Sequence, residues 1–349
     1  MSRPERPLSA PLVPAGDRPH WTFRENDLWA WGVWTEKLPD RGEDAEPLWE
    51  HHRSSGSGII GVFDGAGGAG NAAADPDRFG NRATSAWVAS RVAALATREW
   101  FHSLVTSPGG TPGSEIEVLE DGIASALKLM RPRERSRITG SMVRPMPTTM
   151  AAATYRPSGD QITVRALWAG DSRVYVLQPD WGLCVLTRDH TEEQDTLRQL
   201  RQDPPMENML SASSQLRVEV MKETFKPPFL LLCATDGYFG YVDAPHRFEQ
   251  VLLESLRDAE RAEDLPTELE RRVRTYTGDD ATLSMVAFGF EDFPSLQGSF
   301  DTRLRKLQGL YLSPPTTGQE DFHRWQEECW EHYRVMYEDL IPPIEKGTT

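Results

Sequence analysis

Three aspartates stand at the ends of apolar, strand-like runs, each beside a glycine or a second acid: Asp64, Asp236 and Asp279. Taken singly, an Asp-Gly pair after a strand is usually only a turn. Carboxylates that project from several strand ends over one packed sheet, however, suit hard divalent cations, which prefer oxygen ligands and keep several waters. A fourth candidate is the acidic pair Glu43 and Asp44. Together these residues predict a site for two Mn²⁺ or Mg²⁺ ions.

Seven short motifs carry these acids and their neighbours, and the order of the motifs resembles the PP2C (PPM) family of metal-dependent protein serine/threonine phosphatases. The resemblance runs from about residue 28 to about residue 290, with the spacing of the compact bacterial branch. One such motif alone is a weak signal, whereas seven in the family's order are specific. The motifs are Arg41–Asp44, Gly61–Gly68, Pro147–Met150, Ala169–Arg173, Arg188–Thr191, Ala234–Gly237 and Gly278–Thr282.

The resemblance implies a role for each matched position in a binuclear Mn²⁺ or Mg²⁺ centre. Asp64 corresponds to the carboxylate that bridges both metals, and the backbone carbonyl of Gly65 would bind one of them. Asp236 and Asp279 would complete the other metal site. In this family, metal-activated water hydrolyses phosphoserine and phosphothreonine in proteins, and no covalent enzyme intermediate is required.

The acidic pair and one arginine complete the implied active site. Glu43 and Asp44 match the residues that hold metal-bound waters, and Arg41 lies near the family's phosphate-binding arginine, in a motif one residue shorter than usual. Asp171 matches a signature whose role we take to be mainly structural, fixing a turn between strands. The implied partners are a phosphorylated protein substrate and a cognate Ser/Thr kinase.

Three positions depart from the family's pattern. Ala66 stands where many members have a histidine that helps to protonate the leaving group. We therefore expect water to take that role, and the hydrolysis of alkyl phosphates to be slowed more than that of aryl phosphates. Arg144 stands where bacterial relatives have an aspartate for a third metal, so we expect the third site to be weakened or lost. Asp280 replaces a common asparagine and is expected to change little.

Two other functions remain open. The first is a catalytically weak phosphatase-like module that binds phosphoproteins or partner proteins; the intact acids favour an enzyme, whereas Ala66 and Arg144 leave room for the module. The second is a nuclease or another two-metal hydrolase. The net charge of −15, from 53 acidic and 38 basic residues, disfavours it, because such a surface repels nucleic acid and anionic lipid. We therefore expect no nucleic-acid and no membrane partner.

The hydrophobic pattern predicts an α+β fold. Strands are expected at Trp29–Val33, where a half-buried alternation occurs, and in seven later runs, with helices at Asn81–Val105, from Ser114, and between Pro245 and Tyr276. The stretch from about residue 204 to Lys226 is expected to be irregular, and His51 and His52 to lie in a solvated connection. Strands in two groups with helices between them predict a four-layer αββα sandwich of two mainly antiparallel sheets. The seven later strands are Gly58–Phe63, Thr149–Tyr155, Ile162–Ala169, Arg173–Leu177 with Leu183–Thr187 as a hairpin, Phe229–Ala234 and Thr282–Phe288.

The predicted organisation is a flexible leader over residues 1–20, a phosphatase-type domain over 21–292, and a linker with a C-terminal aromatic helix over 293–349. The helix candidate, residues 319–340, places aromatic and apolar side chains on one stripe, which we expect to dock on its own domain rather than on a protein partner. The longest apolar run, Phe229–Ala234, is too short to span a bilayer and the N-terminus has no apolar signal core, so the expected location is cytoplasmic. Cys184, Cys233 and Cys329 are expected to be buried thiols.

Overall fold

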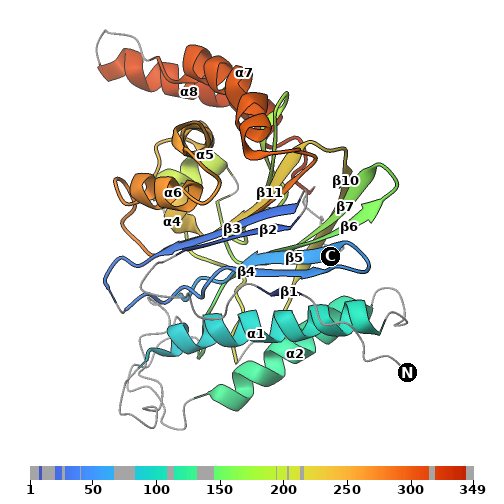
Figure 1. Ribbon diagram of the computed structural model, residues 1–349. Helices are drawn as coiled ribbons and strands as arrows, with labels where there is room; N and C mark the ends of the chain where they lie inside the picture. Colours follow the sequence, from blue (N-terminus) through green and yellow to red (C-terminus); the bar gives the residue numbers. More distant parts are fainter. Residues whose placement is uncertain are drawn as a thin grey trace.

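The computed structural model describes residues 8–9, 20–25, 28–39, 41–66, 83–107, 114–131, 145–193, 195–202, 204–212, 216–313 and 319–342. Within these residues the chain forms two six-stranded sheets that pack face to face, with helices on both outer faces (Figure 1). The predicted α+β fold, a four-layer αββα sandwich, is confirmed.

The first sheet, sheet A, contains strands from both the N-terminal and the middle part of the chain. Every neighbouring pair in it is antiparallel. Its order is β1 (Leu8–Ser9), β4 (Leu48–His52), β5 (Ser57–Val62), β6 (Met150–Ser158), β7 (Gln161–Ala169) and β10 (Glu219–Phe225).

The second sheet, sheet B, is also antiparallel throughout. The turn between its last two strands ends at Gly182, whose φ of 100° suits glycine and not a side chain with a Cβ. Its order is β2 (His20–Glu25), β3 (Leu28–Thr35), β12 (Ala281–Phe288), β11 (Phe229–Ala234), β8 (Arg173–Gln178) and β9 (Gly182–Val185).

The helices cover the two sheets separately. Sheet A is covered by α1 (Ser85–Thr106), which begins with Thr84 as its N-cap, and by α2 (Ser114–Met130). Sheet B is covered by the C-terminal helices (Figure 1). The remaining helices are α3 (Thr196–Gln202), α4 (Asp236–Phe239), α5 (Pro245–Asp258), α6 (Leu265–Val273), α7 (Phe293–Tyr311) and α8 (Gln319–Tyr337).

Three hydrophobic cores separate the four layers. In β5, Ile59 packs against the α1 and α2 side while its neighbour Ile60 packs between the sheets. In β11, Leu231 and Cys233 pack between the sheets and Leu232 packs against the C-terminal helices. Because both faces of these strands are buried, their sequences are continuous apolar runs. The same holds for β3, which is not half-buried as predicted but buried on both faces.

Several expectations for local structure were wrong. The stretch predicted to be irregular contains β10, an edge strand that pairs with β7 from Glu219 to Phe225 and alternates half-buried with exposed side chains over Glu219–Glu223. His51 and His52 lie in β4, where the Nδ1 of His51 is 3.2 Å from the Tyr155 hydroxyl. The expected linker contains α7, which buries six apolar side chains and Arg303 along one face.

The C-terminal helix α8 docks on its own chain, as predicted. Cys329, Trp330, Tyr333 and Tyr337 are buried by this docking, so the buried stripe includes two aromatic residues that the predicted stripe did not contain. Leu8–Ser9, within the predicted leader, pair with β4. The three cysteines are free and buried, and no helix among the described residues is long and apolar enough to cross a membrane.

Candidate metal centre and active site

The predicted carboxylates are carried to one end of the sandwich by the strand register. In sheet B, the antiparallel pairing of Ala234 with Leu283 places the end of β11, and hence Asp236, beside the start of β12, which follows Asp279. In sheet A, Val62 pairs with Ala151, so β5 ends beside the start of β6, and Asp64 follows there. Residues distant in the chain thus lie at neighbouring strand ends, because antiparallel neighbours exchange ends.

Two acids of this end, the buried Asp44 and the half-buried Asp64, share a side-chain hydrogen bond. Burial, and next the charge of Asp280, raise the pKa of Asp44 to about 7. Burial also raises the pKa of Asp64 well above its usual range, and the charges of Asp44, Asp236 and Asp171 raise it further, in that order. Two facing buried carboxyl groups hold a proton between them unless a cation replaces it. This donor set therefore fits a hard divalent cation.

Two threonine hydroxyls hold Asp44 in place. The Oγ1 atoms of Thr235 and Thr282 donate hydrogen bonds to Asp44 Oδ2, at 3.0 and 2.8 Å. The backbone N–H of Thr282 in turn donates to Thr235 Oγ1 at 2.9 Å. Since both bonds go to Oδ2, they orient the carboxyl group toward Asp64. The two threonines belong to the motifs that carry Asp236 and Asp279, and their role was not foreseen from the sequence.

The strand end that carries Asp64 is fixed through its backbone. The carbonyl oxygen of Asp64 accepts hydrogen bonds from the Thr148 hydroxyl at 2.6 Å and from the Thr149 N–H at 2.9 Å. The Thr149 hydroxyl lies 2.6 Å from that of Ser172. Three of the sequence motifs are thereby joined in one network behind the carboxylates.

Gly65 is required by packing. A Cβ built at this position would lie 2.6 Å from the carbonyl oxygen of Glu43, which is closer than real Cβ atoms approach. The loop that carries Glu43 and Asp44 therefore lies directly on the backbone that follows Asp64. Gly237 is packed in the same manner, since its Cβ would lie 1.9 Å from the carbonyl oxygen of Asp280.

Asp280 anchors the loop that carries the acidic pair. Its Oδ1 accepts from the backbone N–H of Lys37 at 2.8 Å, and its Oδ2 accepts from that of Glu43 at 2.6 Å. The expectation that Asp280 changes little is therefore wrong: its carboxylate ties a distant loop to the start of β12. A single sequence holds no sign of this role, because the partners are backbone groups.

A pocket of about 440 Å³ opens at this end of the molecule. Its lining includes Asp171, Asp236 and Asp279 together with Asp189, Thr191, Gln199 and their neighbours. Asp171 therefore faces the predicted site and contributes to its negative field, beyond the structural role expected for it. A larger hollow of about 720 Å³ lies between α1, α2 and the strands β6 and β7, and none of the predicted site residues lines it.

The structure brings the predicted residues together unequally. Asp44, Asp64 and Asp236 interact electrostatically, and Asp236 shares the pocket with Asp279, whose Oδ2 accepts from the Tyr241 hydroxyl at 3.2 Å. Burial and the charges of Asp280 and Asp279 raise the pKa of Glu43, whose carboxylate accepts a hydrogen bond from Thr84. Arg41 is exposed on its loop and does not line the pocket.

No three His, Cys, Asp or Glu side chains stand close enough together to hold a metal ion, as far as the described residues go. The ligand set of Glu43, Asp44, Asp64, Gly65, Asp236 and Asp279 therefore stays a prediction. The expectation for Arg144 at a third metal lies outside the described residues.

No family model matches this sequence, and no curated protein matches it. Solved structures do match the fold. One is PppA of Pseudomonas aeruginosa, described as a key regulatory component of T6SS, at 20% identity and a TM-score of 0.50 over 75% of this chain and 98% of that chain. Another is the serine/threonine phosphatase Stp1 of Staphylococcus aureus, at 15% identity and a TM-score of 0.50 over 74% of this chain and 94% of that chain.

A third match is a phosphatase from Toxoplasma gondii, at 14% identity and a TM-score of 0.51 over 76% of this chain and 94% of that chain. Identities this low establish the fold and not the activity. Together with the seven motifs, they lead to one conclusion: this chain has the fold of the PP2C-type phosphatases, with the motif carboxylates gathered at one end of the sandwich.

Proposed function

We propose that this protein is a metal-dependent protein serine/threonine phosphatase that hydrolyses phosphoserine and phosphothreonine with water activated at a binuclear Mn²⁺ or Mg²⁺ centre. The observation that carries the proposal is the hydrogen-bonded pair Asp44 and Asp64, buried beside Asp236 at the pocket. Structural ion-pair networks also perturb pKa values. Here, however, the charges that raise the pKa of Asp44 and Asp64 all belong to other carboxyl groups.

Divalent cations at such a site lower the pKa of bound water and neutralise the charge of the transferred phosphoryl group. The residues that would hold them are Asp64, the Gly65 carbonyl, Asp236 and Asp279, with Glu43 and Asp44 holding the waters. The chain's own contribution is to orient these oxygens: Thr235 and Thr282 fix Asp44, and Asp280 fixes the backbone of Glu43.

Arg173 is the cation that lines the pocket, yet it is not available to bind a phosphate. Its guanidinium donates to both carboxylate oxygens of Asp189, at 2.9 and 2.6 Å, and is only 3% exposed. The phosphate ligand predicted from the sequence, Arg41, is exposed on the loop that also carries Glu43 and Asp44. We therefore keep Arg41 as the proposed phosphate ligand and assign Arg173 to the wall of the pocket.

The proposal is tested by turnover of p-nitrophenyl phosphate and of a phosphothreonine peptide with Mn²⁺, Mg²⁺ or EDTA. Asp64→Asn and Asp236→Asn are the test variants, and Asp121→Asn on the exposed face of α2 is the matched control. We expect turnover that requires the metal, falls at least about a hundredfold in both test variants, and is unchanged in the control. Turnover that persists in EDTA, or in both test variants, would contradict the proposal.

The alternative is a catalytically weak module of the same fold that binds phosphoproteins or partner proteins. Ala66 is the observation in its favour, since this position offers no acid to the leaving group. The two functions differ in one result: the module binds Mn²⁺ and the phosphothreonine peptide in calorimetry but produces no phosphate. In the enzyme, turnover on the aryl substrate exceeds turnover on the peptide, because a phenolate leaves without help from an acid.

A further inference from the structure

The C-terminal helix α8 is tied to the body of the molecule at two levels. Near its middle, the Tyr333 hydroxyl donates to Glu249 Oε2 at 2.7 Å, and Glu249 also binds Arg303 of α7 at 2.6 and 2.8 Å. This triad is buried and joins α5, α7 and α8 far from the predicted metal ligands. At its C-terminal end, α8 instead reaches β8, β9 and the pocket: the Cys184 thiol lies 3.1 Å from the Met336 carbonyl oxygen.

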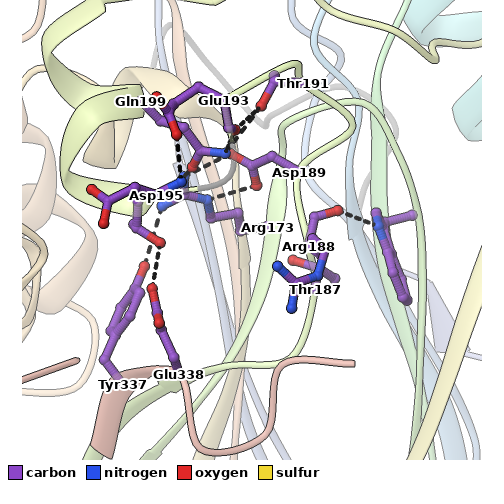
Figure 2. Close-up of polar contacts among 12 residues, drawn as sticks. Arg173, Thr187, Arg188, Asp189, Thr191, Glu193, Asp195, Gln199, Tyr337 and Glu338 are labelled. Carbon is purple, nitrogen blue, oxygen red and sulfur yellow. Dashed lines mark hydrogen bonds and ion pairs between the residues drawn. The ribbon is translucent and has the colours of Figure 1, made fainter. Parts of the chain in front are cut away.

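Tyr337, the last residue of α8, contacts the wall of the pocket through Arg173 (Figure 2). The Nη1 of Arg173 donates to the Tyr337 hydroxyl at 3.2 Å, and that hydroxyl donates to the hydroxyl of Tyr175 at 3.3 Å. Burial alone would lower the pKa of the Arg173 guanidinium, but the facing Asp189 carboxylate outweighs burial and raises that pKa. The Arg173 guanidinium is therefore a cation at every working pH.

Arg173 is the hub from which this contact reaches the pocket. Its Nη2 donates to Gln199 Oε1 at 3.0 Å as well as to Asp189, and its guanidinium lies 4.3 Å from the ring centre of Phe239. Arg173, Asp189, Gln199 and Phe239 all line the pocket that contains Asp236 and Asp279. A hydroxyl on α8 is thus in contact with the lining of the pocket that also includes two of the predicted metal ligands.

A second tie holds the same side of the pocket. The Thr196 hydroxyl donates to Oε1 of Glu338, the residue after α8, at 2.9 Å, and Arg334 lies 3.8 Å from Asp195. We call residues 189–193 and 195–200 the wall segment. Within it, Gln199 Nε2 donates to Thr191 Oγ1 at 3.0 Å and to the Glu193 carbonyl at 2.7 Å.

The wall segment depends on these ties because it has little structure of its own. Its helix, α3, has seven residues, and helices this short are not stable in water without tertiary contacts. Leu197 of this segment packs in the hydrophobic core and the backbone of His190 pairs with Gly170 and Glu207, and regions with few such contacts open locally at a small cost. The polar contacts to Arg173 and Glu338 add to these anchors in keeping this side of the pocket in one conformation.

We propose that the end of α8 is a latch that fixes the wall segment, with Tyr337 as a positioning residue that acts through Arg173, so that the C-terminal helix sets how tightly the pocket holds its substrate. The effect on substrate binding rests on the proposed phosphatase function; the effect on the wall segment does not. Because the predicted metal ligands lie on other strands, loosening the wall weakens substrate binding more than it slows the chemical step.

The test compares two phenol hydroxyls on one helix in the full-length protein. Tyr337→Phe removes the bond to Arg173, and Tyr333→Phe, the matched control, removes a buried bond to Glu249. Hydrogen–deuterium exchange read by mass spectrometry reports opening of the wall segment. We expect exchange there to rise about tenfold in Tyr337→Phe, as loss of a hydrogen bond to a charged group implies, and to stay unchanged in Tyr333→Phe. Thr196→Val, which removes the second tie, is expected to act like Tyr337→Phe.

Kinetics on the phosphothreonine peptide provide the second readout. The KM of Tyr337→Phe is expected to rise at least about threefold with kcat within about twofold of the wild type, and both constants to be kept in Tyr333→Phe. The latch is overturned if Tyr337→Phe and Thr196→Val leave exchange of the wall segment unchanged, or if Tyr333→Phe raises it equally. Should the wild-type protein lack turnover, the exchange comparison still decides on the latch, so failure of the proposed function and failure of the latch are distinguishable.

Discussion

The carboxyl groups of Asp44 and Asp64, 20 positions apart in the chain, meet in a shared hydrogen bond at the buried end of the sandwich. Such a bond requires one of the two groups to carry a proton. Cation binding and proton binding therefore compete for the same oxygens, and the pH dependence of stability reports on this competition.

The first prediction concerns pH in EDTA. The pKa of Asp44 is raised from 3.8 to about 7 in the folded protein, so the folded state binds the proton more tightly. This stabilisation is fully present below about pH 4 and is lost as the pH rises through 7, a change on the order of 4 kcal/mol. Urea unfolding in EDTA from pH 4 to pH 8 is expected to show a flatter profile for Asp44→Asn than for the wild type, with Asp121→Asn unchanged. Parallel profiles for Asp44→Asn and the wild type would rule this account out.

Added Mn²⁺ is expected to reverse this trend. Because the cation takes the place of the proton, the rise in the free energy of unfolding at saturating Mn²⁺ should be larger at pH 8 than at pH 5. Thermal unfolding with and without the ion, at each pH, measures this rise in the free energy of unfolding. An equal rise at both pH values would show that the ion binds elsewhere.

The anchoring role of Asp280 is tested by two substitutions of different severity. Asp280→Ala leaves the N–H groups of Lys37 and Glu43 without their acceptor, and we expect a loss of about 1–3 kcal/mol in the free energy of unfolding. Asp280→Asn keeps one oxygen and should lose about half as much. Weaker Mn²⁺ binding in Asp280→Ala, measured by calorimetry, is expected to accompany the loss, because the loop that carries Glu43 and Asp44 is released. Equal stability of the alanine and asparagine variants would speak against an anchoring role.

A pair of glycine substitutions tests the close contact behind Asp64. Gly65→Ala places a Cβ 2.6 Å from the Glu43 carbonyl oxygen, and overpacking of this kind costs about 1–3 kcal/mol. Gly122→Ala in α2 meets nothing within 4 Å and should stabilise the protein by up to about 1 kcal/mol through helix propensity. Opposite shifts of the urea midpoint are the expected result. An unchanged urea midpoint in Gly65→Ala would mean that the loop of Glu43 does not pack against Gly65 as it does in the structure.

The buried ion pair of Arg303 and Glu249 tests whether α7 is part of the domain. Both side chains are almost fully buried, at 3% and 0% exposure, so Arg303→Met leaves an unpaired buried carboxylate and should cost about 3–5 kcal/mol. The double variant Glu249→Met/Arg303→Met removes both charges and is expected to recover most of that loss in urea unfolding. A single variant as stable as the wild type would show that α7 does not dock on α5.

The fold was predictable to the extent that burial leaves a local pattern. The strands β3, β5 and β11 are apolar runs because both of their faces are covered. In contrast, β4 was missed because its Glu50 is a buried charge, paired with Arg98 at 2.8 Å and hydrogen-bonded to His102 of α1, and no single-sequence pattern shows such a partner.

The candidate site was predictable from its acids but not from the groups that orient them. Asp64, Asp236 and Asp279 can be recognised in the sequence because they lie directly after or before apolar strands. The hydroxyl bonds to Asp44, the backbone bonds to Asp280 and the contact of Tyr337 with Arg173 depend on pairs of residues 164 to 243 positions apart. Only the three-dimensional arrangement shows these contacts.

The location of the metal ions is the most direct test of the central claim. A crystal structure of the protein with Mn²⁺, with anomalous diffraction recorded at the manganese edge, measures it. We predict two anomalous peaks between Asp64, Asp236 and Asp279 on the floor of the pocket, and no such peaks in Asp64→Asn. Peaks remote from these carboxylates, or none at saturating Mn²⁺, would contradict the account.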